Sequence, residues 1–463
     1  MNQTRRSFLK QSLGASFCST SVLSSSLNLR ITGSLAAEET PEPGYKALVC
    51  VFLAGGNDCF NMLTPIEGES WASYQLSRGQ IALPLDAFTS LPAPLDDGRQ
   101  LGLNNAMPEI AGLFNNQRLS FVANIGTLVG PTTKQEVENN SAKLPLGLFS
   151  HSDQQKHWQS SLPETRNPLK GWGGRMSQIL GDLNGSSKVS MNISTAGVNV
   201  FQSGSAVTPF TITPGDLPTI RAWDEPFFAP RQQAMEAMLD AEYRNIFERT
   251  YSSSKKEAIE AGLEYKSAIE NPNLGDPPPF SPDNELSVQL EEVYKAIASR
   301  ETLNKSRQTF FVQIGGWDSH GSLVGHPTRL ANLSKALGEF QNAIDTLGIA
   351  DDVTTFTSSE FGRTLSSNDG GSDHAWGGIQ FVMSGAANLN GGKVFGDYPD
   401  LALGSSLDLG RGRLIPTISV DEYFADLALW MGVSPSSLPT VLPNLSRFHD
   451  VSGGEAPLGL FAS

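Results

Sequence analysis

The sequence predicts an α/β protein with a mainly parallel central sheet and helices on both faces. Three observations support this class. Apolar, strand-forming runs alternate along the chain with amphipathic helical segments. The apolar runs are continuous, which is typical of strands that are buried on both faces. Three of these runs end in small residues followed by polar ones, and ligands bind beyond the carboxyl ends of strands in such sheets.

The expected elements follow in chain order. The run 47–54 predicts a buried strand that breaks at Gly55 and Gly56. Further strands are expected in 118–126, 188–195, 307–313, 352–359 and 378–386. Helices are expected where apolar residues recur at helical spacing, in 172–182, 231–269, 285–303, 329–349 and 419–433. A proline-rich connector spans 270–284.

The first 36 residues have the features of an export signal. "RRSFLK" matches the twin-arginine signal, a mildly apolar serine-rich stretch follows it, and small residues near Ala36 and Ala37 suit cleavage. The alternative is a basic, disordered N-terminus. We expect residues 1–36 to be a twin-arginine signal peptide, the translocase to be a partner during export, and the mature chain to be periplasmic.

The charge of the mature chain excludes two classes of partner. The whole chain has 33 basic and 48 acidic residues and a formal charge of −15. Removing residues 1–36 removes four basic and no acidic residues, which leaves about −19. Such a surface repels nucleic acid and anionic lipid, so neither is expected as a partner. No segment has the length and apolarity of a membrane span.

Two cysteines, Cys50 and Cys59, lie beyond the signal. Cys50 falls in an apolar run and is most simply a core residue. A disulfide between the two is the alternative in an oxidising compartment, although the strand geometry is awkward for it.

Polar clusters follow three of the expected strands. They are "GGNDCFN", "GGWDSHG", and "SSEFGRT" continuing to "GGSDHAWGG". A fourth cluster, "LFSHSDQQKHW", lies earlier in the chain. Five of the six histidines lie in or near these motifs, namely His151, His157, His320, His326 and His374. Since histidines that only fill the surface would scatter, this clustering favours chemistry.

The spacing within the second cluster suits a metal. Residues two apart in an extended chain point to the same side, so Asp318 and His320 can bind one ion together. Divalent ions such as zinc and manganese accept mixed imidazole and carboxylate ligands. We expect a divalent metal, zinc or manganese, with the ligands Asp58, Asp318, His320, Glu360 and His374. Arg363 is expected to hold an anionic substrate group through its planar fork.

Each of these residues also has a structural alternative. Asp58 can cap a helix that begins at Cys59. His320 can be a satisfied core histidine, and Arg363 can pair with Glu360. Asp373 can orient its neighbour rather than bind metal. Taken together, three clusters at three strand ends favour a site.

Six motifs in combination resemble a known family. They are "RRSFLK", "FLAGGNDCFNMLTP", "LFSHSDQQ", "GGWDSHG", "TSSEFGRT" and "DHAWGG". They look like those of exported bacterial proteins grouped as domain of unknown function 1501, a family similar to the alkaline phosphatase and sulfatase superfamily. The resemblance implies one alkaline-phosphatase-like α/β domain over residues 37–463, with a helical and proline-rich insertion at about 226–285.

The chain departs from the superfamily pattern at two points. Glu360 and Phe361 stand where the pattern has Asp-His, which implies one metal or an altered pair. Neither mature cysteine lies in the C/S-x-P-x-R context of sulfatases, which disfavours strict sulfatase chemistry. Ser150 and Ser152 are the nucleophile candidates, because their motif follows a strand and can begin a helix.

The resemblance and the clusters predict an exported, metal-dependent hydrolase of phosphate or sulfate esters that acts on a small anionic ester. The alternative is a non-catalytic envelope protein that binds a metal or a partner on a degenerate hydrolase scaffold, which the missing imidazole at Phe361 favours. A third reading is a sugar- or polymer-modifying enzyme that uses carboxylates for acid–base chemistry.

Overall fold

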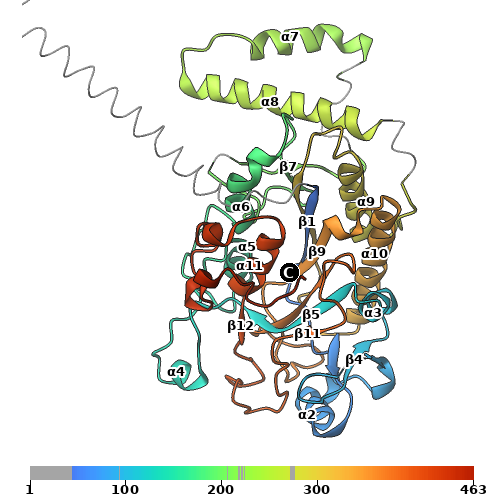
Figure 1. Ribbon diagram of the computed structural model, residues 1–463, viewed down its shortest axis with the longest axis vertical. Helices are drawn as coiled ribbons and strands as arrows, with labels where there is room; N and C mark the ends of the chain where they lie inside the picture. Colours follow the sequence, from blue (N-terminus) through green and yellow to red (C-terminus); the bar gives the residue numbers. More distant parts are fainter. Residues whose placement is uncertain are drawn as a thin grey trace, which may run out of the picture.

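A computed structural model describes residues 44–92, 94–205, 207–216, 219–220, 223, 225–271 and 277–462 (Figure 1). The expected signal peptide, residues 1–36, lies outside the described residues. None of the helices in the described part of the chain combines the length and the apolarity that a membrane span requires.

A nine-stranded sheet forms the centre of the described structure. Its strands are β1 (Lys46–Leu53), β5 (Leu119–Gly126), β6 (Asn192–Ser194), β7 (Phe210–Thr211), β8 (Arg307–Ile314), β9 (Val353–Ser358), β10 (Gly378–Met383), β11 (Val394–Phe395) and β12 (Ile418–Ser419). Their order is β11-β5-β10-β9-β1-β8-β6-β7, and β12 also pairs with β5. Only the pairings of β10, with β5 and β9, are antiparallel. The predicted class, α/β with a mainly parallel sheet, is confirmed.

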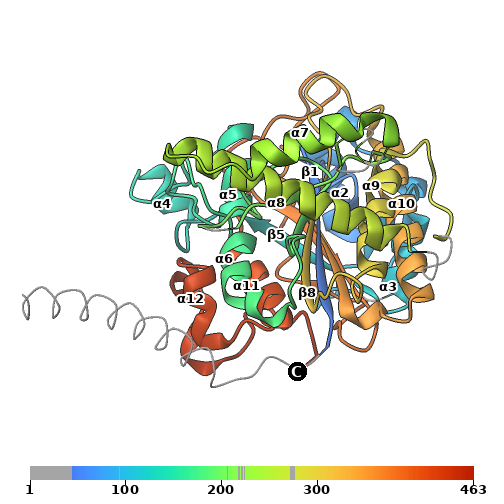
Figure 2. The ribbon, with the colours of Figure 1, turned by 90° about the horizontal axis from the view of Figure 1, so that it is seen from above.

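Helices cover both faces of this sheet because β1 is apolar on both sides. Val49 and Val51 belong to a core shared with α3 (Pro108–Asn115), α9 (Glu285–Ala298) and α10 (His326–Thr346). Cys50 and Phe52 point the other way, into a core shared with α6 (Trp172–Leu180) and α11 (Val420–Trp430). Figures 1 and 2 show these two groups of helices on opposite sides of the strands.

The long helical stretch expected over 231–269 forms two helices, α7 (Ala229–Leu239) and α8 (Ile246–Ile269). The division has a local cause, since Asn245 caps α8 by accepting a hydrogen bond from the backbone N–H of Phe247. α8 packs Tyr265 against Phe210, whereas α7 buries none of its side chains. The two helices lie at one end of the molecule, beyond the sheet (Figure 1).

Several smaller elements were not expected from the sequence. A three-stranded antiparallel sheet and α2 (Gly68–Arg78) follow β1, and the strand predicted over 188–195 is limited to β6. The small sheet has the order β2 (Leu63–Pro65), β4 (Leu101–Asn104) and β3 (Phe88–Ser90). The remaining α-helices of the described residues are α4 (Lys134–Glu138), α5 (His151–Ser160) and α12 (Leu438–Val441).

Cys50 and Cys59 are free thiols, and both are buried. The core position expected for Cys50 is confirmed, and the alternative of a disulfide is wrong. Burial raises the pKa of Cys59 to about 12, so this thiol stays protonated and unreactive at neutral pH.

The strand order brings distant segments to one edge of the sheet. β9, β1 and β8 are parallel neighbours, so the chain leaves all three at the same edge. β10 runs antiparallel to β9 and therefore enters the sheet at that edge. The polar segments that follow Leu53, Ile314 and Ser358, and the one that precedes Gly378, meet there.

Candidate metal centre

Four side chains converge at this edge of the sheet. His151, Asp318, His320 and His374 each offer one ligand atom, and these four atoms lie within 4.8 Å of one another. His151 is the first residue of α5, Asp318 and His320 follow β8, and His374 precedes β10. We call these four residues the cluster.

The three imidazoles of the cluster face the carboxylate through their Nε2 atoms. His320 Nε2 lies 3.0 Å and His374 Nε2 lies 3.5 Å from Asp318 Oδ1. His151 Nε2 lies 3.4 Å from Asp318 Oδ2. The Nε2 atoms of His320 and His374 are 2.8 Å apart.

The other ring nitrogen of each imidazole is hydrogen-bonded to an oxygen. The pairs are His151 Nδ1 with Glu360 Oε1 (2.8 Å), His320 Nδ1 with Asp373 Oδ1 (2.9 Å) and His374 Nδ1 with the carbonyl oxygen of Phe149 (2.7 Å). A carbonyl or carboxylate oxygen can only accept, so each Nδ1 carries a proton. In the neutral rings, each Nε2 then presents a lone pair to the centre of the cluster.

This donor set fits a divalent cation. Two lone pairs 2.8 Å apart repel each other unless a proton or a metal ion lies between them. Around a tetrahedral zinc ion with Zn–N bonds of about 2.0–2.1 Å, neighbouring ligand atoms lie about 3.3–3.4 Å apart. The four separations given above, from 2.8 to 3.5 Å, bracket that value, and all four ligand atoms lie within 4.8 Å of one another. Imidazoles whose Nδ1 is held by an oxygen are typical of zinc ligands.

Arg363 lies completely buried behind Asp318. Its Nε donates to the carbonyl of Gly56 and its Nη1 to the carbonyl of Ser372, both at 2.9 Å. Its Nη2 donates to the carbonyl of Gly55 and, at 2.5 Å, to Asp318 Oδ1. Burial alone would raise the pKa of Asp318, but the hydrogen bond and charge of Arg363, together with His320 and His151, lower it. All the described partners of Arg363 are thus protein groups, and its predicted role as an anion clamp stays a prediction.

Gly55 allows the loop after β1 to pass against the loop after β8. Its φ is +125°, and a Cβ at this position would lie 2.3 Å from the backbone nitrogen of Asp318. A side chain here would push Asp318 away from the imidazoles.

Asp58, a predicted ligand, lies outside the cluster. Its Oδ2 pairs with Arg78 Nη2 at 2.5 Å and accepts a hydrogen bond from Ser372 Oγ at 3.1 Å. Both charged groups are buried. The pair joins α2 to the segment that carries His374.

Glu360, the other predicted ligand outside the cluster, lies directly behind His151. Its Oε1 accepts from His151 Nδ1, from the backbone N–H of Gly55 and from Gln155 Nε2. Its Oε2 is buried and has no hydrogen-bond partner among the described residues. This arrangement suits a group that orients an imidazole.

The two predicted nucleophiles lie beside the cluster. Ser150 and Ser152 flank His151 at the start of α5, and their hydroxyl oxygens are 3.3 Å apart. Ser150 occupies the N-cap position but its side chain makes no capping hydrogen bond. Both hydroxyls are therefore available to a ligand.

Phe361 covers one flank of the cluster. Its buried ring stacks on His374 at 4.4 Å and packs on His151 at 4.9 Å between ring centres. The residue that replaces the imidazole of the superfamily pattern thus contacts two other imidazoles.

His151 was not among the ligands predicted from the sequence. Its motif, "LFSHSDQQ", was noted for its serines, and 24 residues separate it from the end of β5. The only available signal was the concentration of histidines in the polar motifs.

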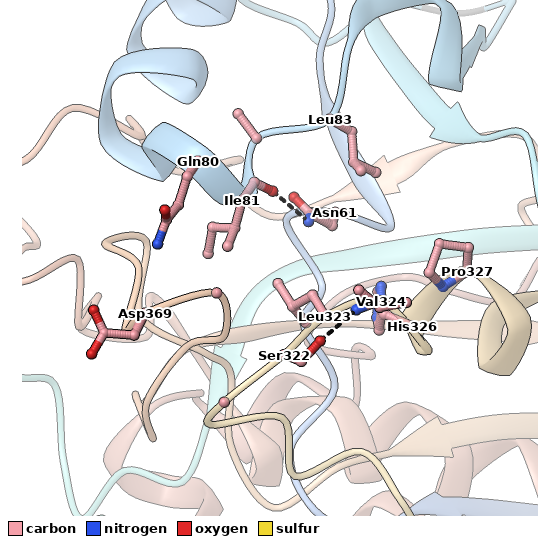
Figure 3. A pocket seen from close by; sticks show the side chains of 13 residues that line it. Asn61, Gln80, Ile81, Leu83, Ser322, Leu323, Val324, His326, Pro327 and Asp369 are labelled. Atoms are coloured by element: carbon pink, nitrogen blue, oxygen red, sulfur yellow. Dashed lines mark hydrogen bonds between the residues drawn. The ribbon is translucent and has the colours of Figure 1, made fainter.

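A pocket of about 470 Å³ begins one residue after His320 (Figure 3). Its apolar lining includes Ile81, Leu83, Leu323 and Val324, with His326 among the polar residues. His326 Nε2 donates to Asn57 Oδ1 at 3.0 Å, and burial lowers the pKa of His326 to about 4, so the ring is neutral at physiological pH. Apart from the carboxylate of Asp369, the pocket offers an uncharged surface next to the charged cluster.

Fold and cluster together define an α/β protein with a candidate metal centre at the carboxyl edge of its sheet. Residues 45–408 match the family described as "Protein of unknown function (DUF1501)". The chain belongs to this family, as its motifs predicted. It matches none of the curated proteins.

Three solved structures are distantly similar. Ps i-CgsB, solved in complex with k-i-k-neocarrahexaose, is 10% identical with a TM-score of 0.33, and the match covers 88% of this chain and 78% of that one. The lipoteichoic acid synthase LtaP from Listeria monocytogenes is 10% identical with a TM-score of 0.31, over 84% and 80% of the two chains. A mutant of the alkaline phosphatase PafA is 12% identical with a TM-score of 0.23, over 70% and 64%. Likenesses at these scores leave activity and substrate open.

His151→Ala is expected to weaken zinc binding by at least about 10- to 100-fold. Loss of a residue that only orients a metal ligand already has an effect of this size, and loss of a ligand should have at least the same effect. The measurement is titration of metal-free protein with zinc, followed by metal analysis. His449→Ala, which removes a histidine near the C-terminus, is the matched control and should bind as the wild type does. Equal affinity of the two variants would show that His151 is not a ligand.

Arg78→Met is expected to destabilise the fold by about 3–5 kcal/mol at pH 7, because it leaves the Asp58 carboxylate buried without its partner. Burial alone raises the pKa of Asp58, but the charge of Arg78 and hydrogen bonds from Arg78 and Ser372 lower it. The pair therefore stabilises the fold above the ordinary aspartate pKa of about 3.9, and this contribution is lost as the pH falls through the lower folded-state pKa.

Urea unfolding of wild type and variant at pH 7 and near pH 3.5 measures this effect. The difference between the two proteins should shrink at the lower pH, where the variant can protonate Asp58. Lys256→Met, which breaks an exposed pair with Asp240, should unfold as the wild type does. A difference that stays constant with pH would argue against the ion pair as its source.

Proposed function

We propose that this protein is an exported, metal-dependent hydrolase of phosphate or sulfate esters. One observation carries the proposal: the Nε2 atoms of His151, His320 and His374 converge on the Asp318 carboxylate with their Nδ1 atoms already occupied. Three imidazole nitrogens and a carboxylate gathered in this way form a donor set that a divalent cation can share. Zinc or manganese suits the donor set.

A divalent cation held by these four residues would act as a Lewis acid and lower the pKa of a hydroxyl or water. The residues around the cluster then have distinct tasks. Glu360, Asp373 and the carbonyl of Phe149 orient the imidazoles. Arg363 keeps Asp318 ionised and in place.

Ser150 or Ser152 is the proposed nucleophile. Their hydroxyls lie at the N-terminus of the ten-residue helix α5, next to His151. The helix dipole at this end favours negative charge on an attacking oxygen.

The charges beside the imidazoles favour an anionic substrate. Three carboxylates, Asp318, Glu360 and Asp373, and two guanidinium groups, Arg363 and Arg411, adjoin them. A divalent cation changes the formal balance of this set from negative to positive. An anion would therefore be attracted locally in spite of the charge of −15 on the whole chain.

The second candidate is a non-catalytic protein that binds a metal or an envelope partner. Two observations favour it: Phe361 occupies one flank of the cluster, and Arg363 is completely buried and donates to Asp318 and to backbone carbonyls. Hydrolysis of an ester by the metal-loaded protein distinguishes the hydrolase from the non-catalytic protein.

Purified protein loaded with zinc or manganese is expected to hydrolyse aryl phosphate or aryl sulfate esters. Asp318→Asn should lower kcat/KM by at least about 100-fold, because it removes the charged ligand. Ser150→Ala and Ser152→Ala, assayed in parallel, identify the nucleophile. A metal-loaded wild type that is silent toward both ester classes would support the non-catalytic candidate.

Export by the twin-arginine route to the periplasm is part of the proposal and rests on "RRSFLK". Replacing both Arg5 and Arg6 by lysine is expected to retain the protein in the cytoplasm, because the signal depends on the arginine pair. Cell fractionation measures this, with Lys10→Arg as the control. An unchanged distribution would mean that another route carries the chain.

A further inference from the structure

The loop Asp408–Leu414, which we call the arginine loop, is held rigidly beside the cluster. The buried carboxylate of Asp408 accepts hydrogen bonds at 2.7 Å from the backbone N–H groups of both Gly410 and Gly412. Asp408 and Leu414 form an antiparallel bridge that closes the loop. Gly412 packs so closely that a Cβ there would lie 2.3 Å from the side chain of Leu365. The arginine loop therefore presents its side chains in a fixed position.

Arg411 connects this loop to a ligand of the cluster. Its Nη1 lies 2.6 Å from Asp373 Oδ2, and Asp373 Oδ1 holds Nδ1 of His320. The side chain is nevertheless 48% exposed. Among the described residues, this bond to Asp373 is the only polar contact of the Arg411 side chain. Its Nε and Nη2 are therefore able to donate further hydrogen bonds.

The backbone of Arg411 is strained in a way that a different residue would relieve. Its φ is +65°, a left-handed conformation that glycine and asparagine adopt more readily than arginine. Holding another residue in this region costs free energy. A role of the guanidinium group therefore explains an arginine at this position better than the conformation of the backbone does.

Arg413 approaches the cluster from a second side. Its guanidinium carbon lies 5.4 Å from the centre of the Phe149 ring, and the carbonyl of Phe149 holds Nδ1 of His374. Its Nε donates to the carbonyl of Gly410 at 3.0 Å. Within the described residues, Nη1 and Nη2 have no hydrogen-bond partner. Asp373 thus lies between Arg411 and His320, and Phe149 lies between Arg413 and His374.

We propose that Arg411 and Arg413 bind a second anionic group, a sulfate or a phosphate, on the ligand whose first anionic group occupies the cluster. Planar guanidinium groups with free donors on a rigid support suit such oxyanions. Arg363 cannot easily take this role, because its donors are engaged with the protein. The substrate class is then a molecule with at least two anionic groups. This inference rests on the proposed function for the first group, but its binding test does not require turnover.

The test compares ligands with one and with several anionic groups by isothermal titration calorimetry on the full, metal-loaded chain. The phosphate pair is fructose 6-phosphate and fructose 1,6-bisphosphate, and the sulfate pair is inorganic sulfate and sucrose octasulfate. We expect the multiply charged member of at least one pair to bind about 10- to 100-fold more tightly, the range of a charged hydrogen-bonded contact. The pair that shows the difference identifies the anion.

Arg413→Gln should remove most of this difference and leave binding of the singly charged ligand unchanged. Arg411→Asn, which suits the left-handed backbone, should also reduce this difference, but it should weaken binding of the singly charged ligand as well, because the Arg411 charge adjoins the cluster; metal analysis controls for its contact with Asp373. Lys256→Gln, on the exposed surface of α8, should have no effect. If Arg413→Gln proves unstable, Arg413→Lys keeps the charge without the planar fork and should give a smaller loss.

Equal binding of the ligands within both pairs, or an unchanged preference in Arg413→Gln, would overturn the inference. Its failure differs from failure of the proposed function. If the protein hydrolyses esters but binds ligands with one and with several anionic groups equally well, only the proposed role of the arginine loop is refuted. If the protein prefers ligands with several anionic groups through Arg413 but hydrolyses no ester, the proposed role of the arginine loop stands and the proposed hydrolase function is refuted.

Discussion

The guanidinium of Arg363 holds together the loops that form the candidate centre. It follows β9, donates to two carbonyls of the loop after β1, to Asp318 after β8, and to Ser372 before β10. A buried charge is tolerated only where it is paired and fully hydrogen-bonded, so these loops have few alternative arrangements. The positions of Asp318 and of the segment that carries His374 both depend on this one side chain.

Around this anchor, each imidazole has its own orienting oxygen. A glutamate, an aspartate and a backbone carbonyl serve His151, His320 and His374 respectively. Because all three oxygens lie on the outer side of the rings, the lone pairs point inward without exception. Such uniform orientation from three unrelated parts of the chain is what makes the cluster chemically distinct from a group of histidines that merely fill space.

The sequence allowed the sheet and three of the four residues of the cluster to be predicted. β1 is a long apolar run, and β8 and β9 are rich in strand-forming residues. Polar residues at the carboxyl ends of parallel strands are expected to meet at one edge of the sheet. Asp318, His320 and His374 were found for this reason. His151 was not, because it follows a long loop rather than a strand.

Partners that are far apart in the chain were beyond prediction for another reason. Asp58 looked like a ligand, yet it meets Arg78 on α2, which no motif marks. Glu360 looked like a ligand, yet its Oε1 faces His151. A carboxylate has the same sequence signature whether it binds a metal, an arginine or an imidazole. Only the packing of the loops decides between them.

The ring of Phe361 bears on the number of metal ions that the cluster can hold. Binuclear hydrolases hold two ions about 3.5–4 Å apart and let them share a bridging oxygen. On the flank that Phe361 occupies, this chain presents aromatic carbon against His151 and His374. In the proposed hydrolase, this flank would offer no ligand to a second ion, and charge on a departing oxygen there would have to be compensated by hydrogen-bond donors of the protein itself.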